Sequence, residues 1–307
     1  MFASVVLSVT LVSVHAFTAH RPLWTYHGPT GPAHWSRLEG SHCAGPSQSP
    51  IDINTQDAIA KTGKLTFHGY NLKEEDAGHP VDIINNGHSA QVNLAGNYLI
   101  KGGGLSSTYK AVQFHFHWGS HNDLGSEHAV DGAKYPAEMH IVHYDYINYG
   151  NLSEAITSQQ PGAVAVVAVF LKVGGKDNPH YDQLMKSLSG VAYEGEEAYV
   201  EPFNLLNLLP PNIDRFYRYE GSLTTPNCDP DVSWTIMEEA VSISQTQLDT
   251  FRSLYSTLES ETPAEHLVDN FRPLQPLEGR QVYLYSPETY AYKWHKVLTI
   301  ISFTDDW

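Results

Sequence analysis

Three histidines lie in two stretches whose side chains alternate between polar and apolar: QFHFHW at 113–118 and EMH at 138–140. Residues two apart along a β-strand point to the same face, so His115 and His117 project together while the aromatic side chains project to the other face. If the two stretches pair as strands, His140 can reach the same point. Three neutral imidazoles with an open fourth position form a catalytic zinc site. The alternative is core histidines with satisfied hydrogen bonds, but the His-x-His spacing between bulky apolar residues favours the metal.

Polar partners for these histidines lie in the same strand rows. A metal-binding imidazole normally donates its second ring nitrogen to a carboxylate, a backbone carbonyl or water. Gln113 shares a face with His115, and Glu138 shares a face with His140, so each can orient its neighbour. Ordinary strand polarity would also explain both residues, but a carboxylate beside a core histidine and between apolar residues argues for the orienting role.

Several motifs of the chain resemble those of the α-class carbonic anhydrases. Beyond the two histidine stretches they are GPAHW at 31–35, QSPI at 48–51, NNGH at 85–88, GSEH at 125–128, GSLTTP at 221–226 and NFRP at 270–273. They occur in family order from about Trp24 to about Ser302, and the resemblance is to the secreted, disulfide-containing type. It implies a zinc lyase that reversibly hydrates carbon dioxide to bicarbonate and a proton, with zinc hydroxide as the nucleophile.

The resemblance also implies roles for individual residues. His115, His117 and His140 would hold Zn²⁺, and the backbone carbonyl of Asn270 would serve the remaining imidazole. Glu127 would accept the hydroxyl proton of Thr224, whose oxygen then fixes the attacking hydroxide. The implied substrate pocket is formed by Val142, Val164, Val166, Leu223, Thr224, Thr225, Val232 and Trp234, for which core packing is an equally simple role.

The implied proton shuttle is His88, because a histidine with a pKa near 6.5 exchanges protons efficiently around pH 7. Without the resemblance, a histidine in an exposed turn would be interpreted as inert. Tyr26, Asn86 and Gln91 match residues that order the water chain, although Gln91 departs from the Asn of some fast members. His128 and His143 match buried structural positions and are expected to have no further role.

Composition and cysteine usage point outside the cell. Lys and Arg number 18 against 34 Asp and Glu, a net charge of −16 that argues against a nucleic-acid partner. Residues 1–16 are expected to be a signal peptide and residues 17–307 the catalytic domain.

Cys43 and Cys228 would be free thiols in the cytosol and paired outside it, and the resemblance implies a disulfide. Asn151 opens a glycosylation sequon. The C-terminal run is too short for a membrane anchor, so we expect a secreted monomer.

Hydrophobic periodicity predicts a β-dominated α+β fold in one domain. Strand-like runs occur at 64–67, 81–85, 90–94, 98–100, 112–118, 138–144, 163–171, 281–285 and 295–301, and helical spacing occurs at 181–188 and 244–258. The resemblance adds a large, twisted, mostly antiparallel sheet with peripheral helices and a central conical zinc cleft. The competing interpretation is a catalytically silent, acidic extracellular binding or matrix protein on the same scaffold. A zinc esterase would be a side activity of the same site.

Overall fold

The computed structural model describes residues 23–71 and 81–287. The expected signal peptide at 1–16 and the expected strand at 295–301 lie outside these ranges. Among the described residues, no helix is both long enough and apolar enough to cross a lipid bilayer.

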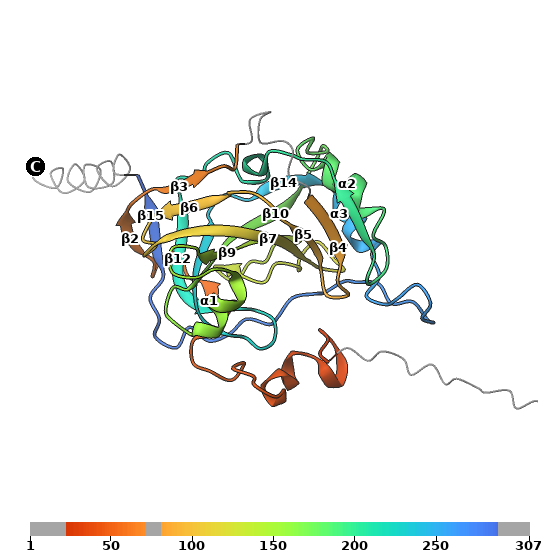
Figure 1. Cartoon of the computed structure of the whole chain (residues 1–307), viewed down its shortest axis with the longest axis horizontal. Coiled ribbons are helices and arrows are strands. Elements are labelled where there is room, and N and C mark those ends of the chain that lie inside the picture. The colour runs from red at the N-terminus through yellow and green to blue at the C-terminus, as the bar shows by residue number, and fades with distance from the viewer. Residues whose placement is uncertain (1–22, 72–80, 288–307) are drawn as a thin grey trace, which may run out of the picture.

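A 13-stranded sheet crosses the molecule (Figure 1). Its main path runs β11-β4-β5-β7-β9-β10-β13-β12-β15-β2, with β6 and then β3 on the edge of β7, and with β14 on β10. The strands of this sheet are β2 (Ile59–Thr62), β3 (Leu65–His68), β4 (Val81–Asn85), β5 (Ala90–Asn93), β6 (Leu99–Gly102), β7 (Thr108–Trp118), β9 (Ala137–Asp145), β10 (Val164–Gly174), β11 (Glu197–Val200), β12 (Phe216–Ser222), β13 (Pro230–Met237), β14 (Val241–Ser244) and β15 (Tyr283–Ser286). Most pairs are antiparallel, as predicted, while β10–β13, β10–β14 and β15–β2 are parallel. Separately, β1 (Asp52–Ile53) pairs with β8 (Ala129–Val130).

The alternation of β7 divides its side chains between the two faces of the sheet. Phe114, Phe116 and Trp118 are fully buried in the larger hydrophobic core. The histidine row faces the other side, where a second buried cluster contains Val142, Val166 and Trp234. The predicted apolar strand at 163–171 is confirmed as β10, which is buried along most of its length because a hydrophobic cluster covers each of its two faces. The sheet thus keeps the histidines next to an apolar wall.

Within residues 23–71 and 81–287, three short α-helices lie around the sheet: α1 (Leu152–Ser158), α2 (Asp182–Leu188) and α3 (Gln245–Arg252). A capping box of Ser244 and Gln247 begins α3, since each side chain accepts the backbone N–H of the other. The helical spacing predicted to continue to Leu258 is wrong, because α3 ends at Arg252. The chain turns there, and Tyr255 donates its N–H to the carbonyl of Ala192, 2.7 Å away.

The N-terminal arm, residues 23–50, has no regular strand and contains two 3₁₀ turns, η1 (Gly28–Thr30) and η2 (Pro32–Arg37). A third such turn, η4 (Leu205–Leu208), lies outside the arm. Cys43 and Cys228 form the expected disulfide, with Cα atoms 4.9 Å apart. The bond ties the arm to the loop that follows β12, and Trp35 packs beside it. The arm is therefore fixed to the segment that carries Thr224.

Candidate metal centre

The pairing of β7 with β9 brings the three histidines together. In the antiparallel register His115 lies opposite His140, and His117 lies opposite Glu138. The ring centroids of His117 and His140 are 4.6 Å apart, and the centroid of His115 lies 5.0 Å and 5.4 Å from them. One nitrogen from each ring lies within 4.8 Å of the other two. The geometry matches the metal site that the strand periodicity predicts.

The outward ring nitrogens all face acceptors. His115 Nδ1 lies 2.9 Å from Gln113 Oε1, His117 Nδ1 lies 2.7 Å from the carbonyl oxygen of Asn270, and His140 Nε2 lies 2.7 Å from Glu138 Oε1. Since these acceptors carry no proton, each imidazole donates outward and turns a lone pair inward. Sequence analysis expects all three of these partners, and the structure places them as expected.

The inward nitrogens fit a cation. His117 Nε2 and His140 Nδ1 lie 3.1 Å apart, and neither carries a proton in the neutral rings. Burial lowers the pKa of His115 and of His117, so both imidazoles are neutral at pH 7. Two buried lone pairs that face each other at this distance need a positive charge between them. A set of three neutral imidazole nitrogens suits Zn²⁺.

Glu127 points its free carboxylate oxygen at this centre. The residue is fully buried, its Oε1 accepts the N–H of Arg272 at 2.8 Å, and its Oε2 has no hydrogen-bond partner. Oε2 lies 3.6 Å from His117 Nε2 and 3.9 Å from His140 Nδ1. The expected hydrogen bond from the Thr224 hydroxyl is therefore not formed in this structure, because the carboxylate oxygen that would accept it is turned toward the imidazoles.

The residues predicted to form the substrate pocket gather in one apolar wall. Val142, Val164, Val166, Val232 and Trp234 belong to a single buried cluster, and Leu223 packs against it. Val166 pairs with Val142 on one side and with Trp234 on the other. The ring of Trp234 lies 4.8 Å from the ring of His140, so the wall adjoins the imidazoles. Thr224 is buried, and the carbonyl of Thr225 accepts the N–H of Cys228.

Comparison with known proteins agrees with this geometry. The profile of the eukaryotic-type carbonic anhydrase family matches residues 30–286. Human (Homo sapiens) carbonic anhydrase 12 is 43% identical over 265 residues, which cover 85% of this chain and 72% of that protein. Carbonic anhydrase 1 of Monodelphis domestica is 40% identical over 266 residues, covering 84% and 96%, and carbonic anhydrase 1 of Oryctolagus cuniculus is 42% identical over 244 residues, covering 78% and 98%. The chain belongs to the eukaryotic-type carbonic anhydrase family. It is an enzyme of the carbonate dehydratase type, and its family is zinc-dependent.

In this carbonic anhydrase the expected shuttle, His88, is less exposed than an open turn would leave it. The Asn86 side chain accepts the N–H of His88 at 3.0 Å and closes the turn. The His88 ring then stacks on Trp24, with centroids 3.8 Å apart and planes 11° apart. Burial lowers the pKa of His88 from 6.5 to about 4. The ordinary pKa assumed from the sequence is therefore wrong for the stacked position, because Trp24 covers the ring.

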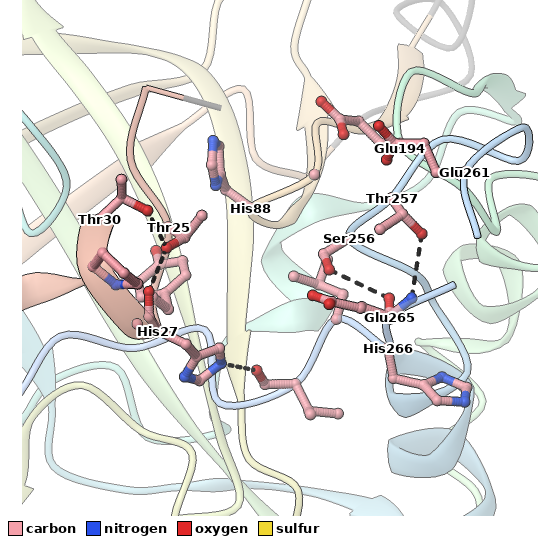
Figure 2. A pocket seen from close by; sticks show the side chains of 16 residues that line it. Thr25, His27, Thr30, His88, Glu194, Ser256, Thr257, Glu261, Glu265 and His266 are labelled. Atoms are coloured by element: carbon pink, nitrogen blue, oxygen red, sulfur yellow. Dashed lines mark hydrogen bonds between the residues drawn. The ribbon is translucent and has the colours of Figure 1, made fainter. Parts of the chain in front are cut away.

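The expected water-network residues lie around His88 and the histidine row. Tyr26 contacts the His88 ring edge-on, with centroids 6.4 Å apart. Gln91 lies opposite His115 in the β5–β7 register, and its Nε2 donates to Asn93 Oδ1 at 2.8 Å. A pocket of about 430 Å³ opens beside His88, between the arm and residues 256–268, and Glu194, Glu261 and Glu265 line it (Figure 2). His88 thus lies between the arm and a recess lined in part by acidic side chains.

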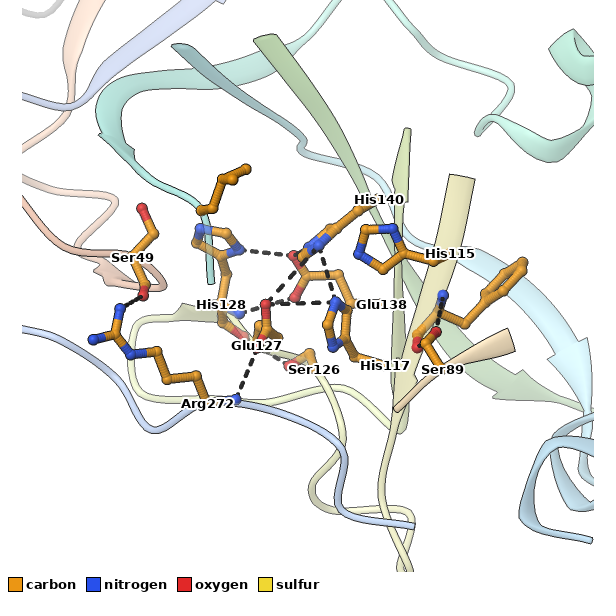
Figure 3. A network of polar contacts seen from close by, with 12 residues as sticks. Ser49, Ser89, His115, His117, Ser126, Glu127, His128, Glu138, His140 and Arg272 are labelled. Carbon is orange, nitrogen blue, oxygen red and sulfur yellow. Dashed lines mark hydrogen bonds and ion pairs between the residues drawn. The ribbon is translucent and has the colours of Figure 1, made fainter. Parts of the chain in front are cut away.

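A buried hydrogen-bond chain behind His140 includes residues for which the sequence predicts no function. Figure 3 shows the end of this chain at His128, Glu138 and His140. His128 Nδ1 donates to Glu138 Oε1 at 2.7 Å, so its Nε2 must accept from the Tyr219 hydroxyl, also at 2.7 Å. The Tyr219 oxygen in turn accepts from the Ser49 hydroxyl at 2.6 Å, and Ser49 Oγ accepts the N–H of Ser222 at 3.1 Å. Because the Glu138 carboxylate can only accept, it sets the direction of every proton in this chain back to Ser49.

The same chain keeps Glu138 ionised. Burial opposes its charge, but His128 and His140 hold the pKa of Glu138 well below its usual range. The sequence predicts only a structural role for His128, yet it donates to Glu138 through both its ring and its backbone N–H. The only sequence signal is its place beside Glu127, and no local pattern links it to Tyr219, 91 residues away.

Proposed function

We propose that this carbonic anhydrase hydrates carbon dioxide at a zinc ion held by His115, His117 and His140. The observation that carries the proposal is the set of three buried imidazoles whose outward nitrogens all face acceptors, which leaves three inward lone pairs. Zinc bound there supplies a nucleophile at neutral pH by lowering the pKa of water from about 15.7 to about 7, the value established for carbonic anhydrase as a family. The remaining steps fall to the protein.

We assign orientation of the attacking oxygen to Glu127 and Thr224. Glu127 Oε2 is a buried acceptor without a donor, which is costly unless a donor reaches it. The hydroxyl of Thr224 supplies that donor when its side chain turns toward Oε2, while Oε1 stays on the N–H of Arg272. The Thr224 oxygen is then restricted to accepting, so it holds the proton of the attacking water and aims the oxygen lone pair at the substrate.

The apolar wall accommodates the substrate. Carbon dioxide is linear and carries no charge, so side chains without hydrogen-bonding groups can hold it beside the metal without desolvating a polar group. Val142, Val166 and Trp234 adjoin the imidazoles and supply the wall, with Val164, Leu223 and Val232 behind them. The region around Thr224 and Thr225 faces the oxygen atoms that become bicarbonate.

His88 takes the departing proton when its ring leaves the stack on Trp24. In the stacked position its pKa of about 4 makes it a weak base at pH 7, whereas a solvated histidine is well matched to that pH. Tyr26, Asn86 and Gln91 lie along the route and order the water between the metal and His88. The proton then passes to buffer.

We propose that the mature enzyme, residues 17–307, is a secreted monomer. The Cys43–Cys228 disulfide supports an oxidising compartment. Asn151 is exposed as the N-cap of α1, where its Oδ1 accepts the N–H of Glu154 at 2.9 Å, and it remains the predicted glycosylation site.

Zinc stoichiometry and stopped-flow hydration over pH test this function. We expect one zinc per chain in the mature protein, and loss of both zinc and hydration in His115→Ala. Hydration that survives in His115→Ala would refute the assignment of the metal site. A wild-type protein that folds but neither binds zinc nor hydrates carbon dioxide would favour the silent, acidic binding protein instead.

A further inference from the structure

Residues 270–272 carry two of the contacts that shape the metal centre. The carbonyl of Asn270 accepts from His117 Nδ1 at 2.7 Å, and the N–H of Arg272 donates to Glu127 Oε1 at 2.8 Å. Both contacts come from main-chain atoms, so they depend on where this segment lies. Neither residue reaches the metal centre with its own side-chain tip.

The Asn270 end of the segment is held by its own side-chain amide, which accepts the N–H of Trp118 and donates to the carbonyls of His88 and Phe116. The side chain of Arg272 fixes the other end. It is only 3% exposed, and its guanidinium donates to Gln48 Oε1 at 2.7 Å, to the Ser49 carbonyl at 2.8 Å and to the Cys43 carbonyl at 3.0 Å. It also lies over the ring of Trp35, 5.8 Å from the centroid. All three acceptors belong to the arm that the disulfide holds in place.

We propose that Arg272 is the positioning residue of Glu127: its side chain anchors residues 270–272 to the disulfide-closed arm, and its backbone N–H thereby sets the rotation of the Glu127 carboxylate. This inference rests on the proposed function, in which Glu127 orients the attacking oxygen through Thr224. With Oε1 held by Arg272, the second oxygen, Oε2, is the one presented to the metal side.

The backbone of Glu127 is held independently of Arg272. Lys134 Nζ donates to the carbonyls of Ser126 and Glu127, at 2.8 Å and 3.2 Å, and lies over the ring of Phe271. Because Lys134 fixes the main chain, the contact with the Arg272 N–H is what determines the orientation of the carboxylate. Lysine cannot replace arginine at 272, since a single ammonium lacks the planar fork that reaches acceptors on several residues at once.

Two variants and a matched control test the proposal. Arg272→Lys keeps the charge but loses the fork, and Gln48→Met removes one acceptor of the guanidinium while nearly keeping shape. The control is Arg280→Lys, because Arg280 also holds the arm, donating to the Gln48 carbonyl at 2.7 Å. It lies over the ring of Tyr219 but makes no hydrogen bond to the Tyr219 hydroxyl, to Glu127 or to the three histidines. Each variant is measured for unfolding midpoint in urea, zinc dissociation by chelator competition, and kcat/KM of hydration over pH.

We expect kcat/KM at its high-pH plateau to fall about tenfold in Arg272→Lys. This is the smallest loss typical for residues that orient the groups around a metal. The fall should be smaller in Gln48→Met. Arg280→Lys should keep the wild-type kcat/KM plateau even if its unfolding midpoint in urea falls as far as that of Arg272→Lys. Zinc binding should stay close to that of the wild type in Arg272→Lys and in the control, since the side chain of Asn270 holds the carbonyl that orients His117 without help from Arg272. Equal plateaus in Arg272→Lys and Arg280→Lys would overturn the proposal. If Arg272→Lys does not fold, an unchanged plateau of kcat/KM in Gln48→Met overturns the proposal.

A wild-type enzyme without zinc or hydration would instead refute the proposed function.

Discussion

Tyr219 connects the metal centre to the interior of the sheet, and Tyr219→Phe tests whether that connection matters. The substitution removes one hydroxyl and leaves the ring in place. That hydroxyl donates to His128 Nε2 at 2.7 Å and accepts from Ser49 Oγ at 2.6 Å. Its loss leaves a ring nitrogen without a donor and a hydroxyl without an acceptor, both in residues that are fully buried.

The expected loss of stability follows from these two orphaned groups. A buried polar group without a partner costs about 1–3 kcal/mol, so the two together lower the free energy of unfolding by about 2–6 kcal/mol. The effect on zinc should be smaller than that of removing a direct partner, which typically costs 10–100-fold. His128 keeps its bond to Glu138, so we expect zinc affinity to fall by about tenfold or less.

Tyr181→Phe is the matched control. Tyr181 is also fully buried, but its hydroxyl donates to the backbone carbonyl of Leu208 at 3.0 Å and belongs to the larger core on the opposite face of the sheet. Urea unfolding and zinc competition on both variants separate the two effects. If Tyr219→Phe is no less stable than Tyr181→Phe and binds zinc like the wild type, the chain from Ser222 to Glu138 has no energetic role and the reasoning fails.

Three further outcomes are expected. Reducing Cys43–Cys228, which closes a separation of 185 residues, should lower the free energy of unfolding by at most about 5 kcal/mol in the chain-entropy estimate, and an unchanged urea midpoint with reductant would contradict this. Gln113→Leu should weaken zinc about 10–100-fold in chelator competition, because His115 Nδ1 loses its acceptor. Burial lowers the pKa of His88 from 6.5 to about 4, so the unfolded chain binds more protons in that window and this group's contribution to stability rises with pH across it. Trp24→Ala should raise the pKa of His88 toward 6.5 in an NMR titration, and a pKa that stays near 4 would show that Trp24 is not its cause.

The metal-facing histidines could be predicted from the sequence because strand geometry alone determines which side chains share a face. Period two places His115 beside His117, and a register slip of one residue would move a strand's side chains to the opposite face of the sheet. Gln113 and Glu138 follow from the same rows. The helix predicted through Leu258 failed for a related reason, since spacing reports which residues are buried but not whether the chain that buries them remains helical.

The support around the histidines could not be predicted, because it joins segments that no local pattern relates. Arg272 contacts Gln48 of the arm, 224 residues before it, and Tyr219 of β12 contacts His128, 91 residues before it. Buried polar groups must all find partners, yet the sequence states only which groups need them. The same packing accounts for His88, whose ring stacks on Trp24 and whose pKa is lowered by burial.

The residues of the strand rows in β7 and β9 and the residues that hold them in place therefore carry different parts of the function. The strand rows determine which atoms can face a metal, and they belong to the rigid centre of the sheet. The arm, the segment at 270–272 and the loop after β12 determine how the carboxylates and hydroxyls around that metal are turned, and the disulfide and Arg272 join them. Substitutions in the arm should therefore alter the rate of hydration before they alter the presence of the metal, whereas substitutions in β7 and β9 should remove both together.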